Sequence, residues 1–292
     1  MAVIAMTREM ATLGKDVAAR LADRLGLTVV HHELVQQDIA ARAGMRESEV
    51  HRFLEGEASL FERWKIDRKR LSRYTVQEIL ELAVKGNVLI RGWGAAYLLR
   101  SVPHVVCARI CAPMPFREQV LMKRLGLKHS GEARAAILTN DAAHSKAMHK
   151  LFGIDWMDSS LYATVLNTER VCVEECAEHI ARLATSAAFQ ETAQSRAALI
   201  DELILSRARA ALEQRFGSGV VELGSIDATV AGGKVTLIGA ASDERVIVEA
   251  VRLMHSVEGV IGVESNIAHL AFVPSLREVK QRDTQASPTS SH

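Results

Sequence analysis

Aromatic residues are scarce in this chain, at 4% of its 292 positions, which argues against a ring-lined surface for sugar binding or base stacking. The formal net charge is only +1, so bulk charge favours neither nucleic acid nor an anionic membrane as partner. No apolar run approaches the roughly 20 residues that span a bilayer. The first apolar run, Val3–Met6, is too short for a secretory signal and is followed at once by Arg8 and Glu9. We therefore expect a cytoplasmic protein with no transmembrane segment and no nucleic-acid partner.

Cysteine is also rare, with four residues that form two C-x3-C pairs, Cys107/Cys111 and Cys172/Cys176. Such spacing can belong to a zinc site, but no histidine pattern accompanies either pair. The second pair stands at helical spacing in an amphipathic segment. The pattern favours buried free thiols over a zinc site.

The stretch from Ala2 to Leu27 predicts a strand, a loop and a helix. Its apolar run has the length of a buried strand, a polar turn follows from Thr7 to Lys15, and apolar residues then recur at helical spacing up to Gly26. This layout is typical of a phosphate-binding loop, in which backbone N–H groups at a helix N-terminus hold an anion and a lysine adds charge.

The loop departs from the usual pattern G-x-x-x-x-G-K-[ST]. Gly14 and Lys15 are present, but Glu9 replaces the first glycine and Asp16 replaces the Ser/Thr whose hydroxyl would bind magnesium. Two interpretations stay open. The segment is either a plain strand-to-helix turn whose Asp16 suits the helix dipole, or a divergent phosphate loop.

Strands and helices alternate along the first part of the chain, which predicts an α/β fold with a mostly parallel sheet and helices on both of its faces. A strand ending at Gly92-Trp93-Gly94 places a glycine-flanked turn where α/β proteins bind ligands. We expect further strands at 104–113 and 164–168, and helices at 74–84, 116–125, 131–150 and 173–184.

Five segments, in this order and spacing, resemble the cytidylate kinase-like family over about residues 1 to 185. They are TREMATLGKDVAARLADRLGL, HHELVQQDIAARAG, GNVLIRGWGA, ICAPMPFREQVLMKRLGL and GIDWMDSSLYATVLNTERVCVEE. The resemblance implies the P-loop fold of nucleoside monophosphate kinases, a parallel sheet flanked by helices with a mobile lid. It also implies phosphoryl transfer from ATP to a nucleotide such as CMP, with Mg²⁺.

The chain departs from that family where the chemistry would occur. The family's loop typically reads S-R-E-x-G-S-G-G-R, and here Ala11 and Leu13 replace two glycines, so that backbone approach to a phosphate is restricted and positive φ becomes costly. The family's G-R-G is Gly92-Trp93-Gly94, where Trp93 either blocks the acceptor pocket or stacks on a base. Its basic lid, an Asp followed by arginines, is Asp141–His144, and its Y-D-L is Tyr162–Thr164.

The retained residues define a predicted nucleotide site. Lys15 would neutralise the donor phosphates, N–H groups around Gly14 would cradle them, and cations further along the chain would reach the transferring group. The predicted catalytic residues are Lys15, Arg117, Lys123 and Arg124, with Lys146 as a further phosphate contact. The predicted nucleotide-binding residues are Arg8, Thr12, Leu13, Gly14, Lys15, Asp16, Gly92, Trp93 and Gly94, with Asp16 as the metal ligand.

These residues support two functional hypotheses. The Gly14-Lys15 pair favours a phosphotransferase that uses ATP and Mg²⁺, whereas the substituted loop favours an inactive or weakened regulatory protein that binds a nucleotide or another anion.

Residues 186–197 are small and polar, and they are interpreted as a linker or a loosely packed helix extension. Residues 198–270 then predict a helix, Leu199–Phe216, followed by a hairpin that turns at Gly232-Gly233, a helix and a strand. The runs Lys234–Gly239 and Val257–Ile267 resemble a BON domain. The resemblance implies a small α+β binding module without catalytic residues, often linked to phospholipid or envelope attachment. In the cytoplasm a ligand-sensing or protein-docking role fits it better. We expect the polar tail, 274–292, to be disordered.

Overall fold

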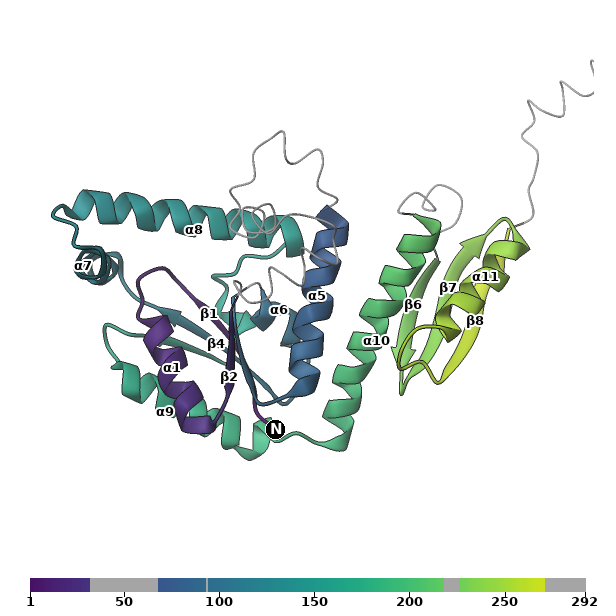
Figure 1. Cartoon of the computed structure of the whole chain (residues 1–292), viewed down its shortest axis with the longest axis horizontal. Coiled ribbons are helices and arrows are strands. Elements are labelled where there is room, and N and C mark those ends of the chain that lie inside the picture. The colour runs from purple at the N-terminus through teal and green to yellow at the C-terminus, as the bar shows by residue number, and fades with distance from the viewer. Residues whose placement is uncertain (32–67, 93, 218–225, 271–292) are drawn as a thin grey trace, which may run out of the picture. The chain divides into compact units, whose positions relative to one another are not determined.

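The structure, a computed structural model, describes residues 1–31, 68–92, 94–217 and 226–270. The chain divides into two compact units, Met1–Ser206 and Arg207–His292, and each is considered by itself (Figure 1). Trp93 and the predicted disordered tail, 274–292, lie outside the described residues.

A five-stranded parallel sheet in the order β2-β3-β1-β4-β5 forms the centre of the first unit. The strands are β1 (Val3–Arg8), β2 (Thr28–His31), β3 (Val88–Arg91), β4 (Val105–Cys111) and β5 (Thr164–Asn167). β1 lies in the middle of the sheet, which explains why it is apolar without alternation: both of its faces are buried. The predicted parallel sheet is confirmed.

Helices cover both faces of this sheet, as the sequence predicts (Figure 1). Because successive side chains of a strand point to opposite faces, Val3 and Ala5 enter one core while Ile4 and Met6 enter the other. The described helices before residue 186 are α1 (Gly14–Leu25), α5 (Arg68–Lys85), α6 (Ala95–Leu99), α7 (Met114–Leu125), α8 (Ser130–Phe152) and α9 (Val173–Thr185). α5 and α6 pack into the first core, and α1 and α9 into the second.

The segment predicted to be a linker or a helix extension contains regular structure. A short 3-10 helix, η2 (Ala187–Phe189), is followed by α10 (Ala193–Phe216), which begins six residues before the predicted Leu199. Thr192 and Ser195 explain the early start, because each backbone N–H donates to the other residue's hydroxyl oxygen at 3.0 Å. This reciprocal cap satisfies two N–H groups that a helix start leaves open.

The second unit contains the predicted hairpin, helix and strand. β6 (Ile226–Ala231) and β7 (Lys234–Ala241) pair antiparallel across Gly232-Gly233, and β8 (Gly262–His269) pairs parallel with β7. α11 (Glu244–His255) buries Ala250 and Met254, while β6 and β7 bury Ala228, Val235 and Leu237. Both turn glycines have positive φ, 56° and 76°, as a tight hairpin turn requires.

The four cysteines are free. Cys107 and Cys176 are buried and Cys111 is partly buried, but Cys172 is exposed at the start of α9, so the prediction of a buried thiol is wrong there. Cys172 is the N-cap residue of α9, so it lies before the helical turns that pack against the core. Helical spacing therefore does not predict its burial. Within the described ranges, no helix is both long and apolar enough to cross a membrane.

Candidate functional site

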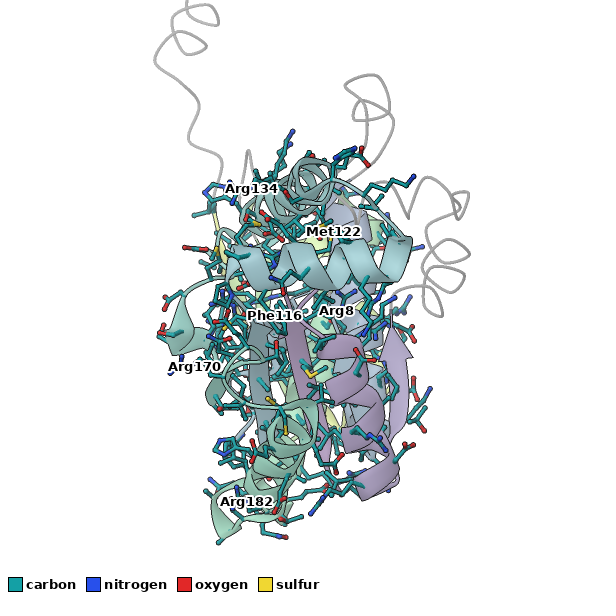
Figure 2. The ribbon with its side chains drawn as sticks, turned by 90° about the vertical axis from the view of Figure 1, so that its left-hand side faces the viewer. Arg8, Phe116, Met122, Arg134, Arg170 and Arg182 are labelled. Carbon is teal, nitrogen blue, oxygen red and sulfur yellow. The ribbon has the colours of Figure 1, made fainter. Side chains whose placement is uncertain are left out.

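The loop between β1 and α1 lies at the carboxyl edge of the sheet. α1 begins at Gly14 after the N-cap residue Leu13, which makes no side-chain capping bond. The side chain of Leu13 therefore does not cap the first N–H groups of α1. An anion site at a helix N-terminus requires N–H groups that are not held by a capping side chain. Gly14 is needed for packing, because a Cβ there would lie 2.8 Å from the Cβ of Arg8. Figure 2 views this side of the unit, with Arg8 and the α7 residues Phe116 and Met122 labelled.

Ala11 and Leu13 adopt left-handed backbone conformations, with φ of 61° and 58°. This conformation costs a residue with a side chain about 1–2 kcal/mol, and glycine normally occupies it. The loop thus keeps a glycine-type path although the two glycines are replaced. Alternation of such conformations turns successive N–H groups toward one point, which is the geometry of an anion-binding nest.

Ala11, one of the two residues that replace the glycines, is used in packing. Ala11 is buried with Leu121 of α7 and with Ala133 and Ile137 of α8, and Met10 packs against the same cluster. The loop is therefore anchored by apolar contacts to the two helices beside it.

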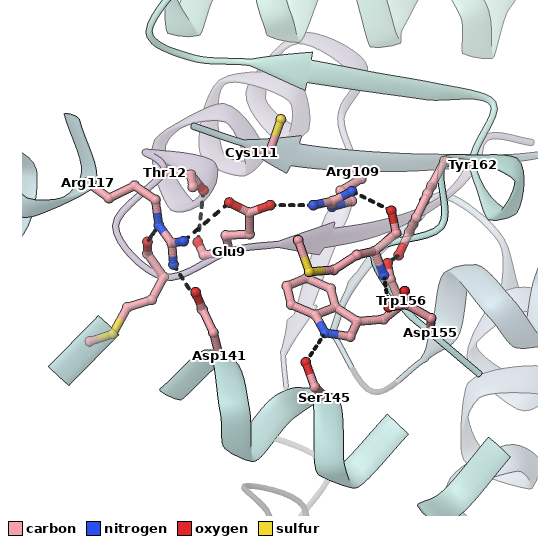
Figure 3. A network of polar contacts seen from close by, with 12 residues as sticks. Glu9, Thr12, Arg109, Cys111, Arg117, Asp141, Ser145, Asp155, Trp156 and Tyr162 are labelled. Carbon is pink, nitrogen blue, oxygen red and sulfur yellow. Dashed lines mark hydrogen bonds and ion pairs between the residues drawn. The ribbon is translucent and has the colours of Figure 1, made fainter. Parts of the chain in front are cut away.

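Glu9 lies at the centre of a buried ion network (Figure 3). One carboxylate oxygen accepts a hydrogen bond from Nη2 of Arg109, and the other lies 3.4 Å from Nη1 of Arg117. The three residues are 6%, 7% and 4% exposed, so these charges are nearly removed from water. Position 9 is thus occupied by an ion-paired carboxylate, a role that sequence reasoning missed. The available signal was Arg109, a charged residue inside the apolar run Val105–Cys111.

Arg117 connects the loop to α8. Its Nε donates to the carbonyl oxygen of Met10 at 2.7 Å, and its Nη2 donates to Oδ1 of Asp141 at 2.8 Å. Arg117 was predicted to reach the transferring phosphoryl group, but in the structure its guanidinium contacts Glu9, Met10 and Asp141 (Figure 3).

Thr12 is held by the loop itself. Its hydroxyl donates to the carbonyl oxygen of Glu9 at 2.8 Å, and its own carbonyl oxygen accepts from the hydroxyl of Thr168 at 2.7 Å. Thr12 is buried, so its predicted part in nucleotide binding falls to its backbone N–H rather than its side chain.

Arg124 is a second cation of α7 that lies near the loop. Arg124, in the last turn of α7, places Nη2 3.7 Å from Oδ2 of Asp16 in the first turn of α1. Both side chains are about half exposed, so this pair contributes little to stability and can open for a ligand. Lys15 and Lys123 are also exposed, and Lys146 is exposed on α8.

The predicted acceptor segment follows β3 at the same sheet edge. Gly92 has a φ of 92° and donates its N–H to the carbonyl oxygen of Met6 at 3.0 Å. Gly94 precedes α6, and a Cβ there would lie 2.6 Å from Cε2 of Phe152, so the end of α8 packs directly on this turn. The turn therefore lies beside the end of β1 and beneath α8.

The lid segment offers no charged histidine at neutral pH. Burial lowers the pKa of His144 to about 4, and its ring packs on Trp156 with centroids 4.3 Å apart. Trp156 donates to Oγ of Ser145 at 2.8 Å, and its carbonyl oxygen accepts from the hydroxyl of Tyr162 at 2.6 Å. Burial raises the pKa of Tyr162, so this cluster is neutral at pH 7.

Asp16 fits Mg²⁺ by its chemistry, because its carboxylate is a hard oxygen ligand at the start of α1 and is half exposed. Among the residues that the structure describes, no three His, Cys, Asp or Glu side chains are grouped to hold a metal. A magnesium ion here would take its other ligands from phosphate oxygens and water, as it commonly does.

Comparisons with known proteins find similarity over the first unit of the chain. The family model for the cytidylate kinase-like family matches residues 3–170. The cytidylate kinase of Pyrobaculum aerophilum is 27% identical over 175 residues, covering 60% of this chain and 88% of the relative. That of Methanopyrus kandleri is 28% identical over 167 residues, covering 54% and 80%.

The solved structures with a similar fold include an uncharacterized protein from Eubacterium ventriosum. It is 18% identical, with a TM-score of 0.50 and coverage of 64% of this chain and 99% of that protein. The model of the cytidylate kinase-like family matches more than half of the length of this chain, and the chain therefore belongs to that family.

Proposed function

We propose that the first unit binds ATP by its phosphates at the β1–α1 loop and transfers a phosphoryl group to a nucleoside monophosphate such as CMP. The left-handed conformations of Ala11 and Leu13 carry this proposal. Backbone strain of this kind persists where the surrounding structure enforces it, and it clusters at ligand sites. A plain strand-to-helix turn needs no such strain.

Phosphoryl transfer depends mainly on positioning and on neutralising charge. In this proposal the N–H groups around Gly14 cradle the donor phosphates and Lys15 neutralises them. Arg124 and Lys123 approach from α7. Asp16 holds the magnesium ion, which supplies further neutralisation of phosphate charge when bound. Gly92 and Gly94 border the acceptor.

A second candidate function is nucleotide binding without transfer, in which the chain acts as a regulatory protein. The contacts of Arg117 with Glu9 and Asp141 favour it, because a guanidinium already paired with carboxylates gives less charge neutralisation to a transition state. The neutral His144 in the lid segment acts in the same direction.

For the second unit we propose a BON-type binding module that docks a ligand or a protein partner in the cytoplasm. The order α10, β6, β7, α11, β8 supports this assignment, as does the parallel pairing of β8 with β7.

The test is a calorimetric titration of the full chain with Mg-ATP and, separately, with CMP. Lys15→Ala is compared with Lys85→Ala, because Lys85 is an exposed lysine just before β3, at the opposite edge of the sheet. We expect ATP binding that only Lys15→Ala abolishes, followed by formation of ADP and a nucleoside diphosphate in an assay across monophosphates. Binding without turnover would select the regulatory function, and no binding at millimolar nucleotide would refute both.

A further inference from the structure

We propose that Asp141 is a built-in competitor for the donor phosphate: it holds Arg117 in the unliganded protein, and a phosphate of ATP displaces it. The inference rests on the proposed function, since it requires ATP at the β1–α1 loop. In this proposal the contact between Asp141 of α8 and Arg117 weakens ATP binding until a phosphate of ATP replaces Asp141.

The three contacts of Arg117 differ in how they can be exchanged. The Met10 carbonyl belongs to the loop backbone, and Glu9 is buried and is also held by Arg109. Asp141 comes from α8, and its side chain is 24% exposed. Of these three partners, Asp141 is therefore the one that solvent and a ligand can reach.

A phosphate can take the place of Asp141 because guanidinium binds both groups through the same planar pattern of N–H donors. The site now holds two arginines and two carboxylates, so its charges balance. An arriving phosphate repels the carboxylate of Asp141, while Glu9 stays between Arg109 and Arg117. Displacement then leaves Arg117 joining the loop to the nucleotide.

The link can open without separating α7 from α8. Ala11, Leu121, Ala133 and Ile137 form an apolar cluster between the loop and these helices. A second ion pair joins the same two helices, with Nε of Arg134 2.6 Å from Oε1 of Glu118. Asp141→Asn should consequently remain folded, and Glu118→Gln removes a charge from the same helix interface at a pair outside the network.

The charge of His144 does not affect how the ATP affinity of the Asp141 variants is interpreted. Asp141 raises the pKa of His144, but burial dominates and holds it at about 4. His144 is thus neutral at pH 7 with or without the charge of Asp141. A change in affinity then reports the contact between Asp141 and Arg117.

The experiment measures the dissociation constant of Mg-ATP for the full-length wild type, Asp141→Asn, Asp141→Ala, Glu118→Gln and Lys15→Ala. We expect both Asp141 variants to bind about tenfold more tightly than wild type, the effect of releasing one hydrogen bond between charged groups. Glu118→Gln should bind like wild type.

Wild-type affinity or weaker binding in both Asp141 variants would overturn the competition while leaving the proposed function intact. Equal tightening in Glu118→Gln would also overturn it, because the effect would then be one of general surface charge. Binding that Lys15→Ala does not change would instead refute the proposed site. If no variant binds ATP, both proposals fail; if only the Asp141 variants bind, the competition is supported in its strongest form.

Discussion

Replacing Glu9 by alanine should destabilise the first unit far more than a surface substitution does. The change removes the carboxylate that lies between Arg109 and Arg117 and leaves two buried guanidinium groups close together. Those two side chains are 9% and 5% exposed, so water cannot readily replace the lost partner.

The expected magnitude follows from burial. Removing one partner of a buried ion pair costs about 3–5 kcal/mol, because the remaining charge stays desolvated. In a unit of this size, 1 kcal/mol lowers the midpoint of thermal unfolding by roughly 2–4 °C. We therefore expect Glu9→Ala to lower it by on the order of 10 °C. Glu118→Ala removes a pair whose arginine is largely exposed and should cost less than about 1 kcal/mol.

Tryptophan fluorescence can follow this unfolding selectively. The chain has three tryptophans, Trp64, Trp93 and Trp156, and all lie within the first unit. Urea titrations of wild type, Glu9→Ala, Arg109→Met and the double variant give the free energy of unfolding and the coupling between the two sites. The double variant should lose less than the sum of the single variants, since both remove the same contact.

Two results would refute this account of Glu9. A free-energy loss in Glu9→Ala within about 1 kcal/mol of that in Glu118→Ala would show that the network carries no more than a surface pair. Additive losses in Glu9 and Arg109 variants would show that the two residues do not depend on one another.

Two further predictions concern the loop and the lid segment. Leu13→Gly should stabilise the first unit or leave its stability unchanged, because relief of about 1–2 kcal/mol of left-handed strain offsets the greater entropy of glycine in the unfolded chain. Urea titration measures the free energy of unfolding of this variant. A loss of more than about 1 kcal/mol in that free energy would contradict the prediction. For His144, the folded-state pKa of about 4 lies below the unfolded value, so the unfolded chain binds more protons between pH 6.5 and 4. Stability should fall over that interval by about 1–3 kcal/mol more in wild type than in His144→Phe, and parallel pH profiles of the two would exclude the assignment.

The sheet and most helices could be predicted because their signals are local. β1 and β4 are short apolar runs, and α9 and α11 show apolar residues at helical spacing. The sequence did not decide between a linker and a helix extension before α10, because Thr192 and Ser195 stand in a small polar stretch that is compatible with both. Their reciprocal cap is a signal of two residues three positions apart, and the composition of the stretch easily outweighs it.

The contacts of the site could not be predicted, because they join distant parts of the chain. Glu9 and Arg109 are 100 positions apart, and Arg117 and Asp141 come from two different helices. The sequence showed a lost glycine at position 9 and a cation at position 117, but not that these residues would pair. Pattern reasoning therefore interpreted Arg117 as a phosphate contact, whereas the structure adds two carboxylates and a carbonyl as its partners.

The strained loop follows from these same long-range contacts. Glycine can adopt positive φ without support, whereas Ala11 and Leu13 together require about 2–4 kcal/mol from elsewhere. The support lies on both sides of the strained residues: Arg117 binds the Met10 carbonyl, Thr168 binds the Thr12 carbonyl, and Ala11 is buried between α7 and α8. One buried and one partly buried hydrogen bond, together with the apolar anchor, are of the right magnitude to offset that strain. A loop held in this way is preorganised by its neighbours rather than by its own residues, so any change in Arg117 or α8 should reach the phosphate site directly.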